Sequence, residues 1–160
     1  MKRIIILFLA GFFACLACTR DKLSQELAYA GAISRICMDW GADKQEVADY
    51  MKDYELKYEG SSVMDYFLSD EDKVVIYNFD DNGLCGSVLR VRNAADVSLD
   101  SVLDGWEYLG SSLEMDAGTI ITSMVDIYVK KDKNMLATTY TVEHDGETYR
   151  IFGFASMPLL

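Results

Sequence analysis

Hydrophobic positions after the first 21 residues recur at helical spacing. Over residues 22–37 the spacing predicts a helix whose apolar side carries Leu23, Leu27, Ala30, Ile33 and Cys37. Trp40-Gly41 then predicts a helix stop, and Asp43 with Glu46 has the spacing of a capping box. A second helix is expected to follow, with its apolar side formed by Val47, Tyr50, Met51 and Tyr54. The pattern predicts a helix, a turn and a helix.

After Tyr54 the pattern becomes extended. Strands are predicted at 54–60, 62–69, 73–80 and 84–92. Asn82-Gly83 is the pair that type I′ hairpin turns prefer, so the last two strands are expected to form a hairpin around it.

The second half repeats this order with a shorter helical stripe at Leu99, Val102, Leu103 and Trp106. Strands are predicted at 107–115, 119–130, 134–143 and 147–156, with a hairpin turn at Asp145-Gly146. When the sequences of the two hairpins are aligned, Tyr77 corresponds to Tyr140. Two degenerate tandem units are therefore predicted, and one unit with an elaborated sheet is the alternative.

The first residues have the pattern of an export signal. Met1-Lys2-Arg3 is basic, and the 14 residues from Ile4 to Ala17 are apolar, whereas a membrane-spanning helix needs roughly 20. Cys18 directly after Leu16-Ala17 resembles the lipobox of bacterial lipoproteins. The resemblance implies cleavage before Cys18, lipidation of Cys18 and a lipid anchor in the bacterial outer membrane, on its periplasmic or cell-surface face. An ordinary secretory signal cut after Ala17 is the alternative.

These patterns predict an α+β fold, in which an N-terminal helix-turn-helix packs on an antiparallel meander sheet. The expected boundaries are a signal peptide at 1–17, a lipidated tether at 18–22, a first helix-plus-sheet unit at 23–92 and a second at 93–160. Such a sheet needs cover on its apolar face, and the helices are expected to supply it.

The turn Trp40-Gly41-Ala42-Asp43-Lys44-Gln45-Glu46-Val47 resembles the aromatic-Gly-x-Ser/Thr-x-x-Glu/Gln-Val turn of a known group. That group includes the β-lactamase inhibitory protein and small outer-membrane assembly lipoproteins of the SmpA/OmlA type. The chain also resembles small lipoproteins of the Bacteroidales. The resemblance implies a helix-turn-helix before an antiparallel sheet, an envelope location and protein binding.

The net negative charge of the chain excludes some classes of binding partner. Cleavage would remove Lys2 and Arg3, leaving 13 basic and 26 acidic residues and a formal charge of −13 over 143 residues. Such a surface repels nucleic acid and anionic membrane, so neither is an expected partner. Cys37 and Cys85 would remain in an oxidising compartment, where they could form a disulfide or stay as buried free thiols.

No catalytic or metal-binding pattern stands out. His144 is the single histidine, which is too few for a histidine-rich zinc site, and no cofactor motif is present. Acidic groups at Asp70-Glu71-Asp72 and Asp80-Asp81 would need a cleft to act as a catalytic pair.

The sequence favours a non-catalytic protein-binding module that uses its sheet face. Tyrosine is a frequent interface anchor, and the candidates in the predicted strands are Tyr58, Tyr66, Tyr128, Tyr140 and Tyr149, although core packing would also explain them. The alternatives are a structural envelope component and an enzyme acting on envelope glycan or peptide.

Overall fold

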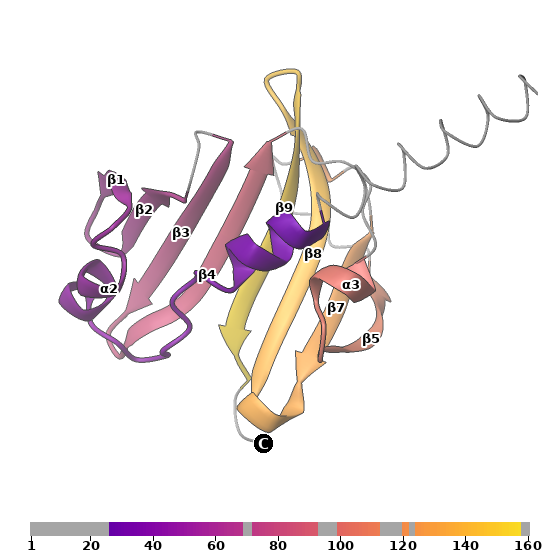
Figure 1. The fold of residues 1–160 in the computed structure, drawn as a ribbon, viewed down its shortest axis with the longest axis horizontal. Coiled ribbons are helices and arrows are strands. Elements are labelled where there is room, and N and C mark those ends of the chain that lie inside the picture. The colour runs from indigo at the N-terminus through magenta and orange to yellow at the C-terminus, as the bar shows by residue number, and fades with distance from the viewer. Residues whose placement is uncertain (1–25, 69–71, 93–98, 113–119, 122–123, 158–160) are drawn as a thin grey trace, which may run out of the picture. The chain divides into compact units, whose positions relative to one another are not determined.

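A computed structural model describes residues 26–68, 72–92, 99–112, 120–121 and 124–157 (Figure 1). The contacts divide the chain into two units, residues 1–31 with 95–104, and residues 32–94 with 105–160. The described part of the first unit holds the start of a helix over 26–33 and the short helix α3 (Leu99–Val102). The second unit holds the helix α2 (Lys44–Tyr50) and the sheet.

The described residues form a mixed α+β fold that consists mostly of strands. Nine strands make one antiparallel sheet: β1 (Glu55–Glu59), β2 (Val63–Phe67), β3 (Lys73–Asp80), β4 (Gly83–Arg92), β5 (Glu107–Ser112), β6 (Ile120–Ile121), β7 (Val125–Lys130), β8 (Met135–His144) and β9 (Glu147–Ser156). A 3-10 turn, η1 (Lys131–Lys133), joins β7 to β8. The strands predicted at 73–80 and 147–156 have these bounds in the structure, whereas the one predicted over 119–130 is divided into β6 and β7.

The strand order is β1-β2-β3-β4-β9-β8-β7-β5, with β6 paired to β8 (Figure 1). The first four strands form one meander and the later ones form another. The last strand of each meander, β4 and β9, joins the two halves over seven residue pairs from Gly86–Ala155 to Arg92–Tyr149.

One face of the sheet, here called the core face, is closely packed. It carries Met64, Tyr66, Val75, Tyr77, Leu89, Ala137, Phe152 and Phe154, all at most 3% exposed. Helix α2 packs against this face through Val47 and Met51, both 0% exposed, and the Tyr77 hydroxyl donates a hydrogen bond to Met51 Sδ at 3.2 Å. The same hydroxyl accepts a hydrogen bond from the Cys37 backbone N–H at 3.0 Å.

The predicted capping box of α2 is confirmed. The Asp43 side chain accepts a hydrogen bond from the Glu46 N–H, and the Glu46 carboxylate accepts one from the Asp43 N–H. The predicted apolar sides of the two N-terminal helices are wrong at Leu27 and Tyr50, which are 66% and 50% exposed. Val47 and the C-cap residue Met51, four positions apart, form the buried side of α2. Tyr50 directly precedes Met51, and neighbouring residues of a helix point about 100° apart, so its side chain turns toward water.

The Trp40-Gly41 turn docks on the β3–β4 hairpin. The Gly41 N–H donates to the Leu84 carbonyl at 2.9 Å, and the Leu84 N–H donates to the Ala42 carbonyl at 2.8 Å. A Cβ at Gly83 would lie 2.6 Å from the Gly41 carbonyl carbon, so the two chains can approach this closely only because residue 83 is glycine.

One predicted hairpin turn is confirmed and the other is displaced. Asp145 and Gly146 both have positive φ, 51° and 79°, between the paired residues His144 and Glu147, as a type I′ turn requires. In the first hairpin Asp80 pairs with Gly83, so Asp81-Asn82 forms the turn and the type I′ prediction at Asn82-Gly83 is wrong. Gly83 has φ 102° because it follows the turn and faces the Gly41 loop.

Candidate functional site

The second face of the sheet, here called the outer face, is also apolar at its centre. Strand pairing places its residues in three rows that cross the sheet: Val63, Asn78, Gly86, Ala155, Leu136 and Val129; Tyr58, Asp65, Ile76, Val88, Gly153, Thr138 and Ile127; Phe67, Val74, Arg90, Ile151 and Tyr140. Most of these side chains are half-buried, although Val74, Val129 and Ile151 are buried. An antiparallel sheet commonly turns a polar face to water, whereas the centre of this face is mostly apolar.

The structure separates the five candidate tyrosines. Tyr58 is 55% exposed and pairs with Asp65, which places it on the outer face. Tyr140 and Tyr149 are half-buried on the same face.

The two other tyrosines belong to the core face, so their prediction as interface residues is wrong. Tyr66 is 3% exposed and packs edge-on against Tyr77, with the ring centroids 6.1 Å apart. Tyr128 is 4% exposed and lies 5.3 Å from the ring of Tyr108. In strands alternate residues face opposite ways, and the register places these two side chains inward.

A hollow of about 170 Å³ lies at the middle of the outer face, where β4, β9 and β8 run side by side. Two core-face residues, Ser87 and Phe154, contribute to its lining. The other lining residues come from the first two rows: Gly86, Val88, Gly153, Ala155, Leu136 and Thr138. The hollow exists because Gly86 and Gly153 have no side chains at the centre of two neighbouring strands. Its lining contains no ionisable side chain.

Charged groups lie on the β1–β4 part of the outer face. Burial raises the pKa of the Asp65 carboxyl, which Lys57 and Arg90 partly offset by favouring its ionised form. Oδ1 of Asp65 is buried without a hydrogen-bond partner in the described part of the chain. Lys57 and Arg90 lie over aromatic rings of the same face, 5.4 Å from the Phe67 centroid and 5.2 Å from that of Tyr149.

The possible disulfide between Cys37 and Cys85 is not formed. Cys37 is a buried free thiol, and burial raises its pKa. Cys85 is an exposed free thiol whose Sγ donates a hydrogen bond to the Asn78 carbonyl at 3.3 Å. The two thiols therefore lie in different surroundings, one in the interior and one at the surface.

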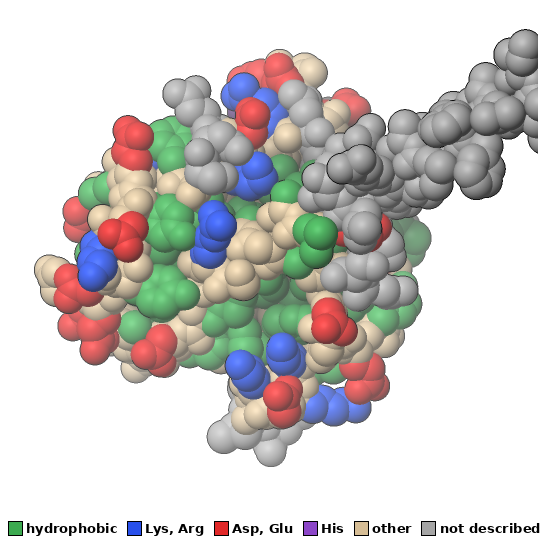
Figure 2. Space-filling view, in the orientation of Figure 1, with side chains coloured by type: hydrophobic (Ala, Val, Ile, Leu, Met, Phe, Trp, Pro, Cys, Tyr) green, Lys and Arg blue, Asp and Glu red, His purple; other side chains and the backbone are tan. Residues whose placement is uncertain are grey.

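Acidic side chains gather over α2 and β1, on the left of Figure 2. The exposed carboxylates of these elements and their flanks are Asp43, Glu46, Asp49, Asp53, Glu55 and Glu59. Across the residues that the structure describes, no group of three His, Cys, Asp or Glu side chains is arranged to hold a metal ion. His144 is exposed and lies 3.5 Å from the Asp145 carboxylate at the β8–β9 turn.

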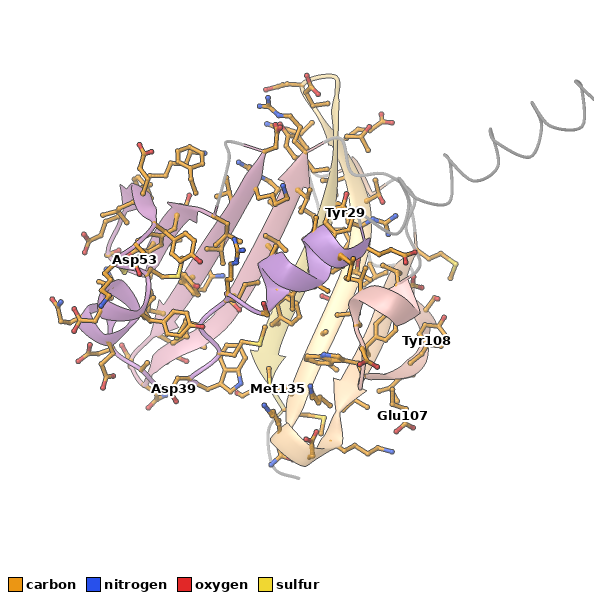
Figure 3. All side chains as sticks on the ribbon, in the orientation of Figure 1. Tyr29, Asp39, Asp53, Glu107, Tyr108 and Met135 are labelled. Atoms are coloured by element: carbon orange, nitrogen blue, oxygen red, sulfur yellow. The ribbon has the colours of Figure 1, made fainter. Side chains whose placement is uncertain are left out.

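A polar cluster lies at the β5 end of the sheet, where Figure 3 labels Glu107 and Tyr108. The Ser111 hydroxyl donates to Asp126 Oδ1 at 2.5 Å and lies 2.5 Å from the Tyr108 hydroxyl. Ser111 lies within β5. Both hydrogen bonds are exposed to water.

Sequence reasoning missed the hollow and most of the outer face. Glycine inside a strand marks a place where another group can approach closely, and Gly86 and Gly153 carried this pattern. Consecutive apolar residues in β3 and β9, as in Val74-Val75-Ile76, also indicated a sheet that is apolar on both faces.

Among the described residues, the structure has no helix with the length and apolar character needed to cross a membrane. Comparison of the chain with protein-family models, with curated proteins and with solved structures gave no match.

Proposed function

We propose that this chain is a non-catalytic, lipid-anchored protein of the bacterial envelope that binds another protein through the outer face of its sheet. The observation that carries the proposal is the apolar centre of that face, where side chains are only partly buried. Val88, Leu136 and Tyr140 lie there without full burial. Contiguous apolar surface of this kind is typical of protein interaction sites.

Tyrosines at the β1 edge and on the central strands of the outer face support protein binding. Tyr58 lies on the edge strand β1, and Tyr140 and Tyr149 lie on β8 and β9. Tyrosine gives a large apolar contact and one hydroxyl at a small cost in side-chain entropy, which suits interface anchors. The acidic side chains over α2 and β1 would steer a basic partner toward the molecule.

The two meanders support the further proposal that the chain contains two degenerate tandem units. Each half of the chain supplies a meander whose last strand lies at the centre of the sheet. The predicted equivalence of Tyr77 and Tyr140 is wrong, because these residues occupy opposite faces. Matching the two turns, Asp81-Asn82 with Asp145-Gly146, aligns residues that occupy the same face.

The anchor rests on Cys18, which lies outside the described residues. We expect that cells fed an alkyne analogue of palmitate incorporate it into the wild-type protein, and that Cys18→Ala abolishes this labelling because no other residue supplies the acylated thiol. Fluorescence after click coupling measures the result. Cys15→Ala is the matched control and should keep the label. Equal labelling of Cys18→Ala and wild type would remove the anchor from the proposal.

Binding through the outer face is tested with two tyrosines of similar exposure. Tyr58 is 55% exposed on the outer face, and Tyr50 is 50% exposed on α2, the helix that packs on the core face. A short-range crosslinker applied to intact envelopes, followed by mass spectrometry, should recover one dominant partner. We expect Tyr58→Ala to reduce that recovery about tenfold and Tyr50→Ala to leave it unchanged.

Because both side chains are exposed, neither substitution is expected to unfold the protein, and thermal unfolding checks this directly. A loss of the partner in both variants, or in neither, would contradict binding through the outer face. Recovery of no enriched partner at all would favour a solitary structural role in the envelope.

A further inference from the structure

We infer that the hollow at the centre of the outer face receives one large apolar side chain of a partner protein, from a segment that also carries lysine or arginine. The inference rests on the proposed function and names the chemistry of the partner at this surface. Its basis is the size and lining of the hollow together with the charges that border it.

The size of the hollow selects a side chain as its occupant. Pockets that enclose small-molecule ligands usually measure about 300–1,000 Å³, which exceeds the 170 Å³ found here. From the outer face, the lining takes Val88, Leu136, Ala155 and the two glycines, with Thr138 as the one outer-face hydroxyl among the lining residues. Such a site gains free energy from burying aliphatic or aromatic carbon and offers no ion a partner.

Exposed carboxylates near the hollow favour a lysine or arginine next to that side chain in the partner segment. Gly86 pairs with Asn78, and Asp80 follows two residues later on β3, about 7 Å along the strand. Asp80 and Asp81 are exposed, and within the described ranges neither has an ion-pair partner. Two cations around the hollow are already engaged. Arg90, two residues after Val88, favours the ionised form of Asp65 and lies over the Tyr149 ring. Lys131 is paired with Glu107 at 2.7 Å, which leaves Lys133 as the remaining cation of η1.

Gly86 allows the hollow to be filled without disturbing the sheet. Its backbone is not in the left-handed region, and an added Cβ would meet only the Phe154 carbonyl oxygen at 3.5 Å, an ordinary contact. Valine is also a better strand residue than glycine. Gly86→Val should therefore occupy the hollow while thermal stability stays equal or rises. Gly153 is less suitable, because its Cβ would lie 2.8 Å from Thr138 Oγ1.

The experiment pans a phage-displayed library of random peptides against the full-length lipidated protein in nanodiscs. The enriched peptides should share a large aliphatic or aromatic residue next to lysine or arginine. Gly86→Val should weaken their binding about 10- to 100-fold, because one buried apolar side chain is lost. Ser156→Val, which adds the same side chain at an exposed position of β9, should not change it.

Three results would overturn the inference. The peptides could bind Gly86→Val as tightly as wild type, the library could yield no enriched peptide, or sedimentation could show a dimer that Gly86→Val dissociates, which would make a second copy the occupant. The envelope crosslinking with Tyr58→Ala separates this failure from that of the proposed function. If Tyr58→Ala still loses the partner while Gly86→Val keeps it, the outer face binds without using the hollow.

Discussion

Replacing Gly83 by alanine is expected to destabilise the protein by roughly 3–5 kcal/mol. The residue has φ 102°, where an L side chain is strained, and its Cβ would lie 2.6 Å from the Gly41 carbonyl carbon and 2.8 Å from the Ala42 carbonyl oxygen. These neighbours are backbone atoms that cannot rotate away. The loop must move, and the two hydrogen bonds between it and Leu84 would be lost. Urea denaturation of the full-length protein measures the change in unfolding free energy.

Gly146→Ala is the matched control for this prediction. Gly146 also has positive φ, 79°, at the turn of the other hairpin, but an added Cβ there would have no atom within 4 Å. Its substitution should cost only the backbone strain, about 1–2 kcal/mol. The difference between the two variants therefore isolates the docking of the Gly41 loop on the β3–β4 hairpin. Equal costs for both would contradict that docking as a source of stability.

Local pattern was sufficient to predict the parts of the fold that depend on neighbours in sequence. The capping box at Asp43 and Glu46 and the type I′ turn at Asp145-Gly146 need only residues within four positions, and both are confirmed. The bounds of β3 and β9 follow from β-branched and aromatic runs that end at turn residues.

The first hairpin shows why the remainder could not be predicted. Asn82-Gly83 has the preferred type I′ composition, yet the turn forms one residue earlier. Gly83 is held against Gly41, a contact between residues 42 positions apart that no local pattern reports. The displacement changes which residues of β3 align with β8, so Tyr77 and Tyr140 lie on opposite faces instead of at equivalent positions.

The candidate site also depends on contacts between residues that are far apart in the sequence. The sequence predicts tyrosines in the strands as interface residues, but it does not say which face each one occupies. Only the strand register places Tyr58 and Tyr140 on the outer face and Tyr66 and Tyr128 on the core face. The hollow forms because Gly86 and Gly153 come to lie near each other from strands more than 60 residues apart. The sequence contains both glycines, but not the pairing of β4 with β9 that brings them close together.

The contact between α2 and the sheet gives the second large expected effect. Met51→Ala should destabilise the protein by about 2–5 kcal/mol, because the side chain is fully buried and its removal leaves a cavity. The change also removes the sulfur that accepts the Tyr77 hydroxyl. Burial raises the pKa of Tyr77, so this hydroxyl stays protonated beyond the usual range and needs an acceptor throughout. Urea denaturation again measures the unfolding free energy.

Met51→Leu divides that cost between packing and hydrogen bonding. Leucine keeps most of the buried volume but offers no sulfur, so the expected loss is below about 1.5 kcal/mol. If Met51→Leu instead cost as much as Met51→Ala, the hydrogen bond to sulfur would dominate over the cavity. Tyr77→Phe then distinguishes the two partners of the hydroxyl, because it removes the donor to Met51 and leaves the buried Cys37 N–H without an acceptor, at a cost of about 1–3 kcal/mol. A larger loss in Tyr77→Phe than in Met51→Leu would show that the hydroxyl acts mainly by holding the segment before the Trp40-Gly41 turn on the core face.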